Sequence, residues 1–277
     1  GLADEINTCI GCNQACLDNV FAGKLTSCLV NPRACHETEL VIKPSTKPLK
    51  IAVVGAGPAG MAFAATAAER GHHVTLFDTA DAIGGQFKLA CRIPGKEEFN
   101  ETLRYFYHRL KSAGVTFKLG QRVEVGDLAQ GTFDHVVLAT GVVPRRLDVP
   151  GGDYATVVTY IELIEGRKVA GDKLAIIGAG GIGFDIAEFL THPGDNKTAL
   201  ERFQDEWGID STLAARGGLK PPEKETSPRQ VWLLQRKTSK VGDGLAKTTG
   251  WIRRSLLTMR DVRMLAAYLA RYALDED

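Results

Sequence analysis

The sequence has little net charge, no long apolar run and no recognisable leader. Its 34 lysines and arginines nearly balance 33 acidic residues, for a net charge of +1, so there is no electrostatic case for binding nucleic acid or an anionic membrane. No apolar stretch approaches the roughly 20 residues of a membrane-spanning helix, and no secretory signal is visible. We therefore expect a cytoplasmic chain without nucleic-acid or membrane partners. Because it begins with Gly1 and not Met, we also expect it to be cut from a longer protein.

What the chain does contain is enough apolar material for a core and an uneven distribution of cysteine. With 277 residues, 44% of them hydrophobic, it is long enough for about two domains. Four of its six cysteines lie within the first 28 residues. A disulfide framework is typical of short secreted proteins, whereas a chain of this length that also carries nucleotide-binding motifs favours metal binding in a reducing compartment.

The four early cysteines are Cys9, Cys12, Cys16 and Cys28, with the spacing C-x2-C-x3-C-x11-C. Thiolates in this number suit a cubane iron–sulfur cluster. A four-cysteine zinc site is the alternative, but such sites usually pair two C-x2-4-C hooks, and zinc is redox-silent. Cys35 is a second candidate for the fourth ligand, because it follows Cys28 by only seven residues.

A first nucleotide-binding pattern begins after the cysteines. An apolar strand is predicted over residues 50–54, followed by Gly55-Ala56-Gly57-Pro58-Ala59-Gly60 and a helix over 58–70. The glycines permit a tight turn and the close approach of a pyrophosphate, which would lie against the positive end of the helix. The next strand, 73–78, ends in Asp78, where a carboxylate can accept ribose hydroxyl groups. We predict a dinucleotide site here.

Two further glycine-containing segments follow in the same region. Gly84-Gly85-Gln86 and Ala139-Thr140-Gly141 would let the backbone approach a flavin-type nucleotide. Between them, the apolar spacing predicts an amphipathic helix over 97–112 and strands over 115–119 and 133–139.

The pattern then restarts. A strand over 173–177 precedes Gly178-Ala179-Gly180-Gly181-Ile182-Gly183, and a helix is predicted over 182–190. The second strand, 230–235, comes only after an insert, residues 191–229, in which some helix is expected around 200–207.

We therefore predict an α/β protein in which a cysteine-rich iron–sulfur segment is followed by two Rossmann-like dinucleotide-binding domains. The predicted boundaries are 1–46 for the cluster segment and linker, 47–166 for an FAD-binding domain, and 167–277 for an NADP(H)-binding domain.

The second site differs from the first in charge. Its second strand ends in Gln235-Arg236-Lys237, with no carboxylate. A carboxylate would repel a 2′-phosphate, whereas a guanidinium can bind one with two hydrogen bonds. This favours NADP(H) over NAD(H); the alternative is that Arg236, Lys237 and Lys240 are only a solvated basic run.

With these motifs the chain resembles the iron–sulfur flavoenzymes related to bacterial NADPH-dependent 2,4-dienoyl-CoA reductase. The resemblance rests on residues 6–16 (INTCIGCNQAC), 25–32 (LTSCLVNP), both glycine motifs, 83–87 (IGGQF), 138–141 (LATG) and 233–237 (LLQRK). It implies a plan in which an N-terminal TIM barrel holds FMN and the acyl-CoA substrate, followed by a [4Fe-4S] segment and FAD and NADP(H) domains. Electrons would pass from NADPH to FAD, then through the cluster to FMN, which reduces a 2,4-dienoyl thioester of fatty acid β-oxidation.

The resemblance also assigns site residues. The metal ligands would be Cys9, Cys12, Cys16 and Cys28. The cofactor-binding residues would be Gly55, Gly57, Ala59, Gly60, Asp78, Gly85, Gln86, Val123, Gly141, Gly178, Gly180, Gly181, Gly183, Arg236 and Lys237.

The chain departs from the family plan at both ends. The chain itself contains no barrel segment, so we expect FMN and the dienoyl-CoA site to lie outside this chain, which alone would be inactive on acyl-CoA. It also stops at Asp277, before the segment that completes the FAD domain in the family. The alternatives are a related enoate reductase or amine dehydrogenase, an electron-transfer subunit like the small subunit of glutamate synthase, and a zinc module beside degenerate nucleotide folds.

Overall fold

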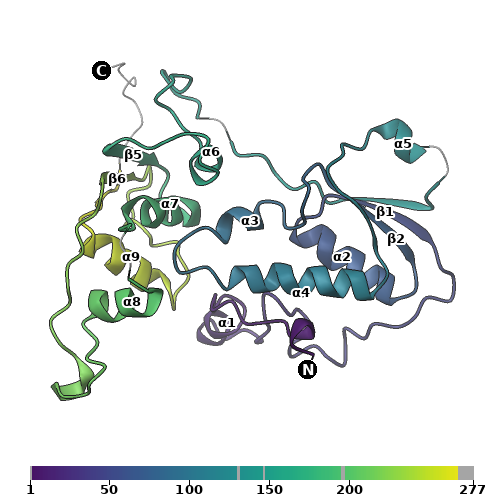
Figure 1. Cartoon of the computed structure of the whole chain (residues 1–277), viewed down its shortest axis with the longest axis horizontal. Helices are drawn as coiled ribbons and strands as arrows, with labels where there is room; N and C mark the ends of the chain where they lie inside the picture. Colours follow the sequence, from purple (N-terminus) through teal and green to yellow (C-terminus); the bar gives the residue numbers. More distant parts are fainter. Residues whose placement is uncertain (1, 130–131, 146, 195–196, 268–277) are drawn as a thin grey trace. The chain divides into compact units, whose positions relative to one another are not determined.

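The structure is a computed structural model that describes residues 2–129, 132–145, 147–194 and 197–267. The chain divides into two compact units (Figure 1): residues 1–92 with 96–145, and residues 93–95 with 146–277. The structure thus groups residues 147–166 with the second unit, and the predicted domain limits remain predictions. In the part of the chain that the structure describes, no helix is both long and apolar enough to cross a membrane.

The first unit is built on a parallel sheet with strand order β3-β2-β1-β4. Its strands are β1 (Lys50–Val54), β2 (His73–Phe77), β3 (Thr116–Lys118) and β4 (His135–Leu138). The central pair runs in register from Lys50 opposite His73 to Val54 opposite Phe77. Because β1 lies at the centre, the turn after it opens at the carboxyl edge of the sheet, where open α/β sheets bind ligands.

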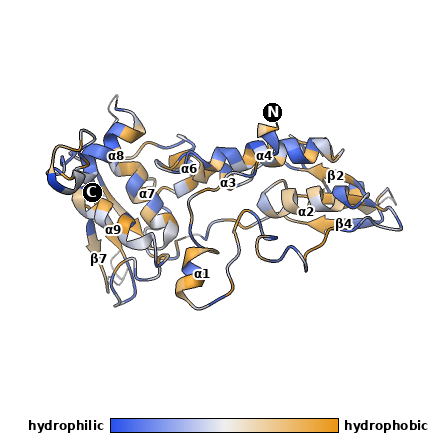
Figure 2. Ribbon diagram, turned by 90° about the horizontal axis from the view of Figure 1, so that it is seen from below, coloured by the Kyte–Doolittle hydropathy of each residue, from blue (hydrophilic) through white to orange (hydrophobic). Residues whose placement is uncertain are grey.

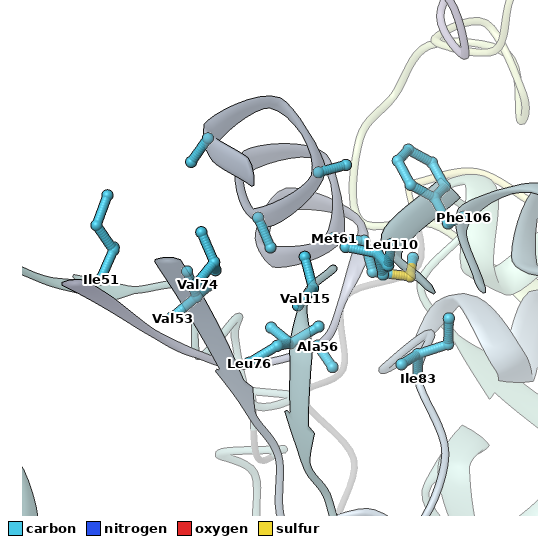
Figure 3. Packing of buried hydrophobic residues seen from close by; sticks show 13 residues of the cluster. Ile51, Val53, Ala56, Met61, Val74, Leu76, Ile83, Phe106, Leu110 and Val115 are labelled. Carbon is cyan, nitrogen blue, oxygen red and sulfur yellow. The ribbon is translucent and has the colours of Figure 1, made fainter. Parts of the chain in front are cut away.

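Helix α2 (Pro58–Glu69) packs on β1 and β2 and contacts α4 (Phe99–Ser112). Alanines give α2 a narrow profile, so it can lie close to the strands. α4 alternates apolar and polar residues along its length (Figure 2), and its Phe106 and Leu110 are buried. The core between helices and sheet is shown in Figure 3; its larger members are Ile51, Val53, Met61, Val74, Leu76, Ile83, Phe106, Leu110 and Val115. Two short helices, α3 (Phe87–Ala90) and α5 (Val125–Ala129), lie in the connections.

The cysteine-containing segment is attached to this unit by hydrogen bonds from an arginine. It holds a 3-10 turn, η1 (Ala3–Glu5), and a short helix, α1 (Leu17–Phe21). From α4, Arg104 donates to the carbonyl of Ala3 at 3.2 Å and to that of Ile6 at 2.9 Å. It also pairs with Glu101 on its own helix at 2.6 Å. The backbone just ahead of Cys9 is thereby fixed to α4.

The second unit repeats the plan with three parallel strands in the order β5-β6-β7. These are β5 (Lys173–Ile177), β6 (Gln230–Leu234) and β7 (Arg263–Leu265). Helix α7 (Gly181–Thr191) follows β5, α9 (Gly250–Met259) precedes β7, and α6 (Tyr160–Ile164) comes before the sheet. The strand β7 lies within residues 259–277, a tail that the sequence alone allows to be read either as strands or as helix. Residues 268–277 lie outside the described part.

The insert between α7 and β6 carries helix α8 (Ala199–Trp207) and a 3-10 turn, η2 (Arg216–Gly218). The predicted helix is therefore present. α8 buries charged residues and exposes apolar ones: Arg202 and Glu206 are each 9% exposed, whereas Leu200 is 65% and Phe203 51% exposed. Glu206 accepts the Arg260 Nε–H at 3.0 Å, and Arg260 is buried. The insert is thus tied to the interior of its unit by a buried ion pair.

Candidate functional site

The first glycine turn, residues 55–60, joins β1 to α2 and has the geometry of a nucleotide-binding site. We call it the first cradle. Gly55 has a φ of 109°, and its N–H donates to the Phe77 carbonyl at 2.8 Å. A Cβ at Gly55 would lie 2.2 Å from the Ala139 carbonyl oxygen, and one at Gly60 would lie 1.8 Å from the Gly55 carbonyl oxygen. These two glycines are therefore required by the close approach of backbone to backbone, with or without a ligand.

Gly57 is different, because no described atom lies within 4 Å of the position its Cβ would take. It has an ordinary φ of −73° and stands at the N-cap of α2, where no side chain in the described structure caps the helix. Pro58 and the exposed Ala59 begin the first turn. The space beside Gly57 at the N-terminus of this 12-residue helix is thus open, which suits a pyrophosphate.

Two other predicted segments meet at this turn. The Gly84 N–H donates to the Ala56 carbonyl at 2.7 Å. A Cβ at Gly85 would lie 3.0 Å from the Gly57 Cα. The Gln86 side-chain amide donates to the Val142 carbonyl, next to Gly141. The segments around residues 57, 85 and 141 are therefore joined by direct contacts.

Asp78 follows β2 and uses both carboxylate oxygens to hold the backbone. Its Oδ2 accepts the Ala56 N–H at 2.6 Å, and its Oδ1 accepts the Ala80 N–H at 2.8 Å. A carboxylate has about four lone-pair sites, so it can still accept ribose hydroxyl groups. The Gln121 N–H donates to the Asp78 carbonyl at 3.2 Å, which brings the chain leading to Val123 to the same edge of the sheet.

The second glycine turn, residues 178–183, lies between β5 and α7 and repeats these features. We call it the second cradle. Gly178 has a φ of 116°, and its N–H donates to the Leu234 carbonyl at 3.0 Å. A Cβ at Gly183 would lie 1.9 Å from the Gly178 carbonyl oxygen. At Gly180 and Gly181 no described atom lies within 4 Å of the Cβ position. The N-terminus of α7 is thus open in the same way.

The two cradles differ in the residues that come directly after the second strand of each unit. In the first unit Asp78 follows Phe77, the last residue of β2. In the second unit Gln235 follows Leu234, the last residue of β6, and is followed by the exposed Arg236 and Lys237. The first cradle therefore presents a carboxylate and the second a neutral amide with two cations. This separation of charge favours different nucleotides at the two sites.

The cysteines are free thiols, all six lying in the described part of the chain. The Ser27 N–H donates to the Ala15 carbonyl at 2.8 Å, which draws the neighbours of Cys28 and Cys16 together. The Gly11 N–H donates to the Cys9 Sγ at 3.4 Å. The soft donor set fits an iron–sulfur cluster. Within residues 2–129, 132–145, 147–194 and 197–267, however, no three His, Cys, Asp or Glu side chains are gathered closely enough to bind one metal ion.

Sequence reasoning missed two residues that shape these sites. Arg104 fixes the segment ahead of Cys9, and Leu103 beside it packs against the turn at Gly84, where a Cβ would lie 2.9 Å from the leucine Cδ2. The signal in the sequence was weak, because the pattern of an amphipathic helix does not reveal which of its arginines contacts residues far away in the chain.

Comparison with known proteins decides the family. The family model described as pyridine nucleotide-disulphide oxidoreductase matches residues 43–215, more than half of the chain. The chain belongs to this family. Its members are oxidoreductases that bind FAD and NAD(P)H, in agreement with two cradles of Rossmann type in one chain.

Individual relatives are reductases of several kinds. The chain is 38% identical over 204 residues to a metal reductase of Desulforamulus reducens, covering 72% of this chain and 30% of that protein. It is 32% identical over 207 residues to a cinnamate reductase of Clostridium sporogenes, covering 73% and 30%. The solved structure of 2-naphthoyl-CoA reductase in complex with 2-naphthoyl-CoA has a TM-score of 0.78 at 28% identity, covering 95% of this chain and 35% of that one.

The chain thus spans about a third of the length of these proteins. The comparisons support an electron-transfer role between nicotinamide and flavin nucleotides, as in NAD(P)H-dependent flavin oxidoreductases. They support the resemblance found in the sequence at the level of flavin-dependent reductases, and they do not single out dienoyl-CoA reductase.

Proposed function

We propose that this chain is the NADPH-oxidising, electron-relaying part of a larger reductase of the 2,4-dienoyl-CoA type. The single observation that carries the proposal is the pair of glycine cradles with unlike charge, Asp78 beside one and Arg236-Lys237 beside the other. One chain with two such sites is suited to taking electrons from a phosphorylated nicotinamide nucleotide and passing them to a flavin.

In this proposal FAD binds at the first cradle. The open N-terminus of α2 at Gly57 binds its pyrophosphate, and the segments at Gly85, Gln86 and Gly141 approach the rest of the molecule. Asp78 keeps the glycine turn in place and accepts ribose hydroxyl groups. When bound, FAD supplies the ability to take up two electrons and to release them singly.

NADPH binds at the second cradle, with its pyrophosphate at the N-terminus of α7 around Gly180 and Gly181. Arg236 and Lys237 bind the 2′-phosphate. Both are exposed, and charge-assisted hydrogen bonds to a phosphate are among the stronger ones available at a protein surface. Because this strand end carries no carboxylate, the 2′-phosphate meets no repulsion from that position.

The cysteine segment is proposed to hold a [4Fe-4S] cluster on Cys9, Cys12, Cys16 and Cys28. Support comes from the soft donor set and from the free state of all four thiols. FMN and the acyl-CoA substrate are placed in a barrel outside this chain. The relative bound to 2-naphthoyl-CoA supports a CoA thioester as substrate.

A related enoate reductase is the second candidate, since one relative is a cinnamate reductase. The two are separated at the substrate end by assaying the full-length protein with a 2,4-dienoyl-CoA and with free cinnamate. Reduction of the free acid alone would favour the enoate reductase.

The nucleotide assignment is tested by calorimetric binding of NADP⁺ and NAD⁺ to the double variant Arg236→Ala/Lys237→Ala. We expect NADP⁺ affinity to fall by about 10- to 100-fold, the equivalent of one or two charge-assisted hydrogen bonds, with NAD⁺ affinity unchanged. The control is Arg167→Ala/Lys168→Ala, which removes an exposed basic pair after α6. An unchanged preference in the first double variant would contradict the assignment.

A further inference from the structure

Gln235 occupies in the second unit the position that Asp78 occupies in the first. β1 and β2 end with Val54 opposite Phe77, and β5 and β6 end with Ile177 opposite Leu234. In both units the first glycine donates its N–H to the carbonyl of the last residue of the second strand. The next residue is therefore equivalent in the two cradles.

The two equivalent side chains form hydrogen bonds with different backbone groups. Asp78 accepts a backbone N–H from the glycine turn at Ala56. The Gln235 side chain instead reaches forward along the chain, and its Nε2 donates to the Ser239 carbonyl at 2.8 Å and to the Lys237 carbonyl at 3.3 Å. These contacts close residues 235–239 into a compact loop, which we call the basic loop.

Two backbone hydrogen bonds also join the basic loop to residues at and just after the end of β7. The Gln235 N–H donates to the Leu265 carbonyl at 2.9 Å, and the Ala267 N–H donates to the Lys237 carbonyl at 2.9 Å. The Lys237 carbonyl thus receives one bond from Gln235 and one from Ala267. The backbone of the basic loop is fixed, while the side chains of Arg236 and Lys237 are left exposed.

From these contacts we propose that Gln235 is a positioning residue that sets the preference of the second cradle for a 2′-phosphorylated nucleotide. The inference rests on the proposed function, in which Arg236 and Lys237 bind that phosphate. A loop fixed before binding loses less conformational entropy when its cations engage the ligand.

The amide of Gln235 can both close the basic loop and tolerate a nearby phosphate. It supplies the two N–H donors that the loop carbonyls need, and it carries no charge to repel a phosphate. A carboxylate at this place could donate nothing to the carbonyls of Lys237 and Ser239 when ionised, and it would stand beside the bound dianion. The neutral Gln235 therefore combines loop closure with tolerance of the phosphate.

The test measures NADP⁺ and NAD⁺ binding by calorimetry in the wild-type chain and in Gln235→Leu, Gln235→Glu and Gln230→Leu. The oxidised nucleotides donate no hydride, so binding is read without turnover. Gln230 is the matched control, because it is exposed at the opposite end of β6.

Gln235→Leu is expected to weaken NADP⁺ binding by about tenfold, the worth of one or two hydrogen bonds, without changing NAD⁺ binding. Gln235→Glu is expected to weaken NADP⁺ binding by roughly a hundredfold, since repulsion is added to the loss of donors. Gln230→Leu should leave both affinities as in the wild type.

The outcomes separate the two proposals. A wild-type chain that binds both nucleotides equally would overturn the proposed 2′-phosphate site itself. A wild-type preference for NADP⁺ that Gln235→Leu and Gln235→Glu both retain would overturn only the role of Gln235. NAD⁺ binding reports that each variant is folded, and if the leucine variant fails to fold, the glutamate variant decides.

Discussion

Asp78 and Gln235 stand at equivalent positions of two parallel strand pairs, and each is bonded to the loop that its cradle needs. Asp78 holds the Ala56 N–H of the glycine turn, whereas Gln235 holds the carbonyls of Lys237 and Ser239 in the basic loop. A single equivalent position therefore carries opposite hydrogen-bonding character in the two halves, acceptor in one and donor in the other.

The first prediction concerns this acceptor. Asp78→Ala leaves the Ala56 and Ala80 N–H groups without their carboxylate, and we expect a loss of about 1–3 kcal/mol in the free energy of unfolding together with a loss of bound FAD. Urea denaturation and the flavin content of the purified chain measure the two effects. The control is Asp134→Ala, which removes a carboxylate that accepts the Lys50 N–H at 2.7 Å at the other end of β1. It should affect stability and spare FAD binding; equal loss of flavin in both variants would contradict the role of Asp78.

A second prediction separates the glycines of the first turn. Gly57→Ala should fold like the wild type, because its φ is −73° and the added methyl group meets no described atom within 4 Å. It should nevertheless lose FAD, since the methyl group fills the space in front of α2. Gly60→Ala should instead destabilise the fold by about 1–3 kcal/mol or more, as its Cβ would lie 1.8 Å from the Gly55 oxygen. Thermal melting with and without FAD tests both, and flavin binding by Gly57→Ala would show that the pyrophosphate lies elsewhere.

The cysteine ligands give a third prediction. After anaerobic reconstitution, Cys28→Ser should lose iron, acid-labile sulfide and visible charge-transfer absorption, whereas Cys35→Ser should keep all three. Cys35 is a free thiol on the same segment, seven residues after Cys28, so its substitution serves as the control. The reverse pattern would make Cys35 the fourth ligand, and zinc without iron in the reconstituted wild type would contradict the cluster.

The fourth prediction concerns Arg104. Arg104→Ala removes the donors to the carbonyls of Ala3 and Ile6, so amide hydrogen exchange over residues 2–12 should become about ten- to a hundredfold faster, as expected for the loss of one or two such bonds. The control is Arg109→Ala on the same helix, which breaks an ion pair with Glu69 at 2.6 Å and leaves η1 attached. Equal acceleration in both variants would mean that α4 as a whole, and not Arg104, holds the segment.

Much of the fold could be predicted from the sequence because its signals are local. The glycine turns at Gly55 and Gly178 each stand between an apolar strand and a helix, and the structure places them there with positive φ. Strands β1, β2, β5 and β6 agree with the predicted ranges to within one residue at each end. The spacing of apolar residues and the residue types of turns are set within a few neighbouring residues, so the sequence reveals them.

The rest depends on contacts between distant residues. Arg104 binds carbonyls about a hundred positions earlier in the chain, and Glu206 meets Arg260 across 54 residues. The short helices α1 and α6 hold five residues each, too few to produce a periodic pattern. The role of Gln235 was missed for a different reason. The sequence showed that a carboxylate was absent there, but it could not show where the amide would donate.

The ion pair between Glu206 and Arg260 has a consequence for anyone who reshapes this protein. A connection with so many charged and small residues invites redesign, yet replacing Glu206 while α8 stays in place would leave the Arg260 guanidinium without its carboxylate in a position that is only 5% exposed. An unpaired buried cation costs about 3–5 kcal/mol, a large share of a domain's stability. Variants that replace Glu206 within α8 should therefore replace Arg260 with an apolar side chain at the same time.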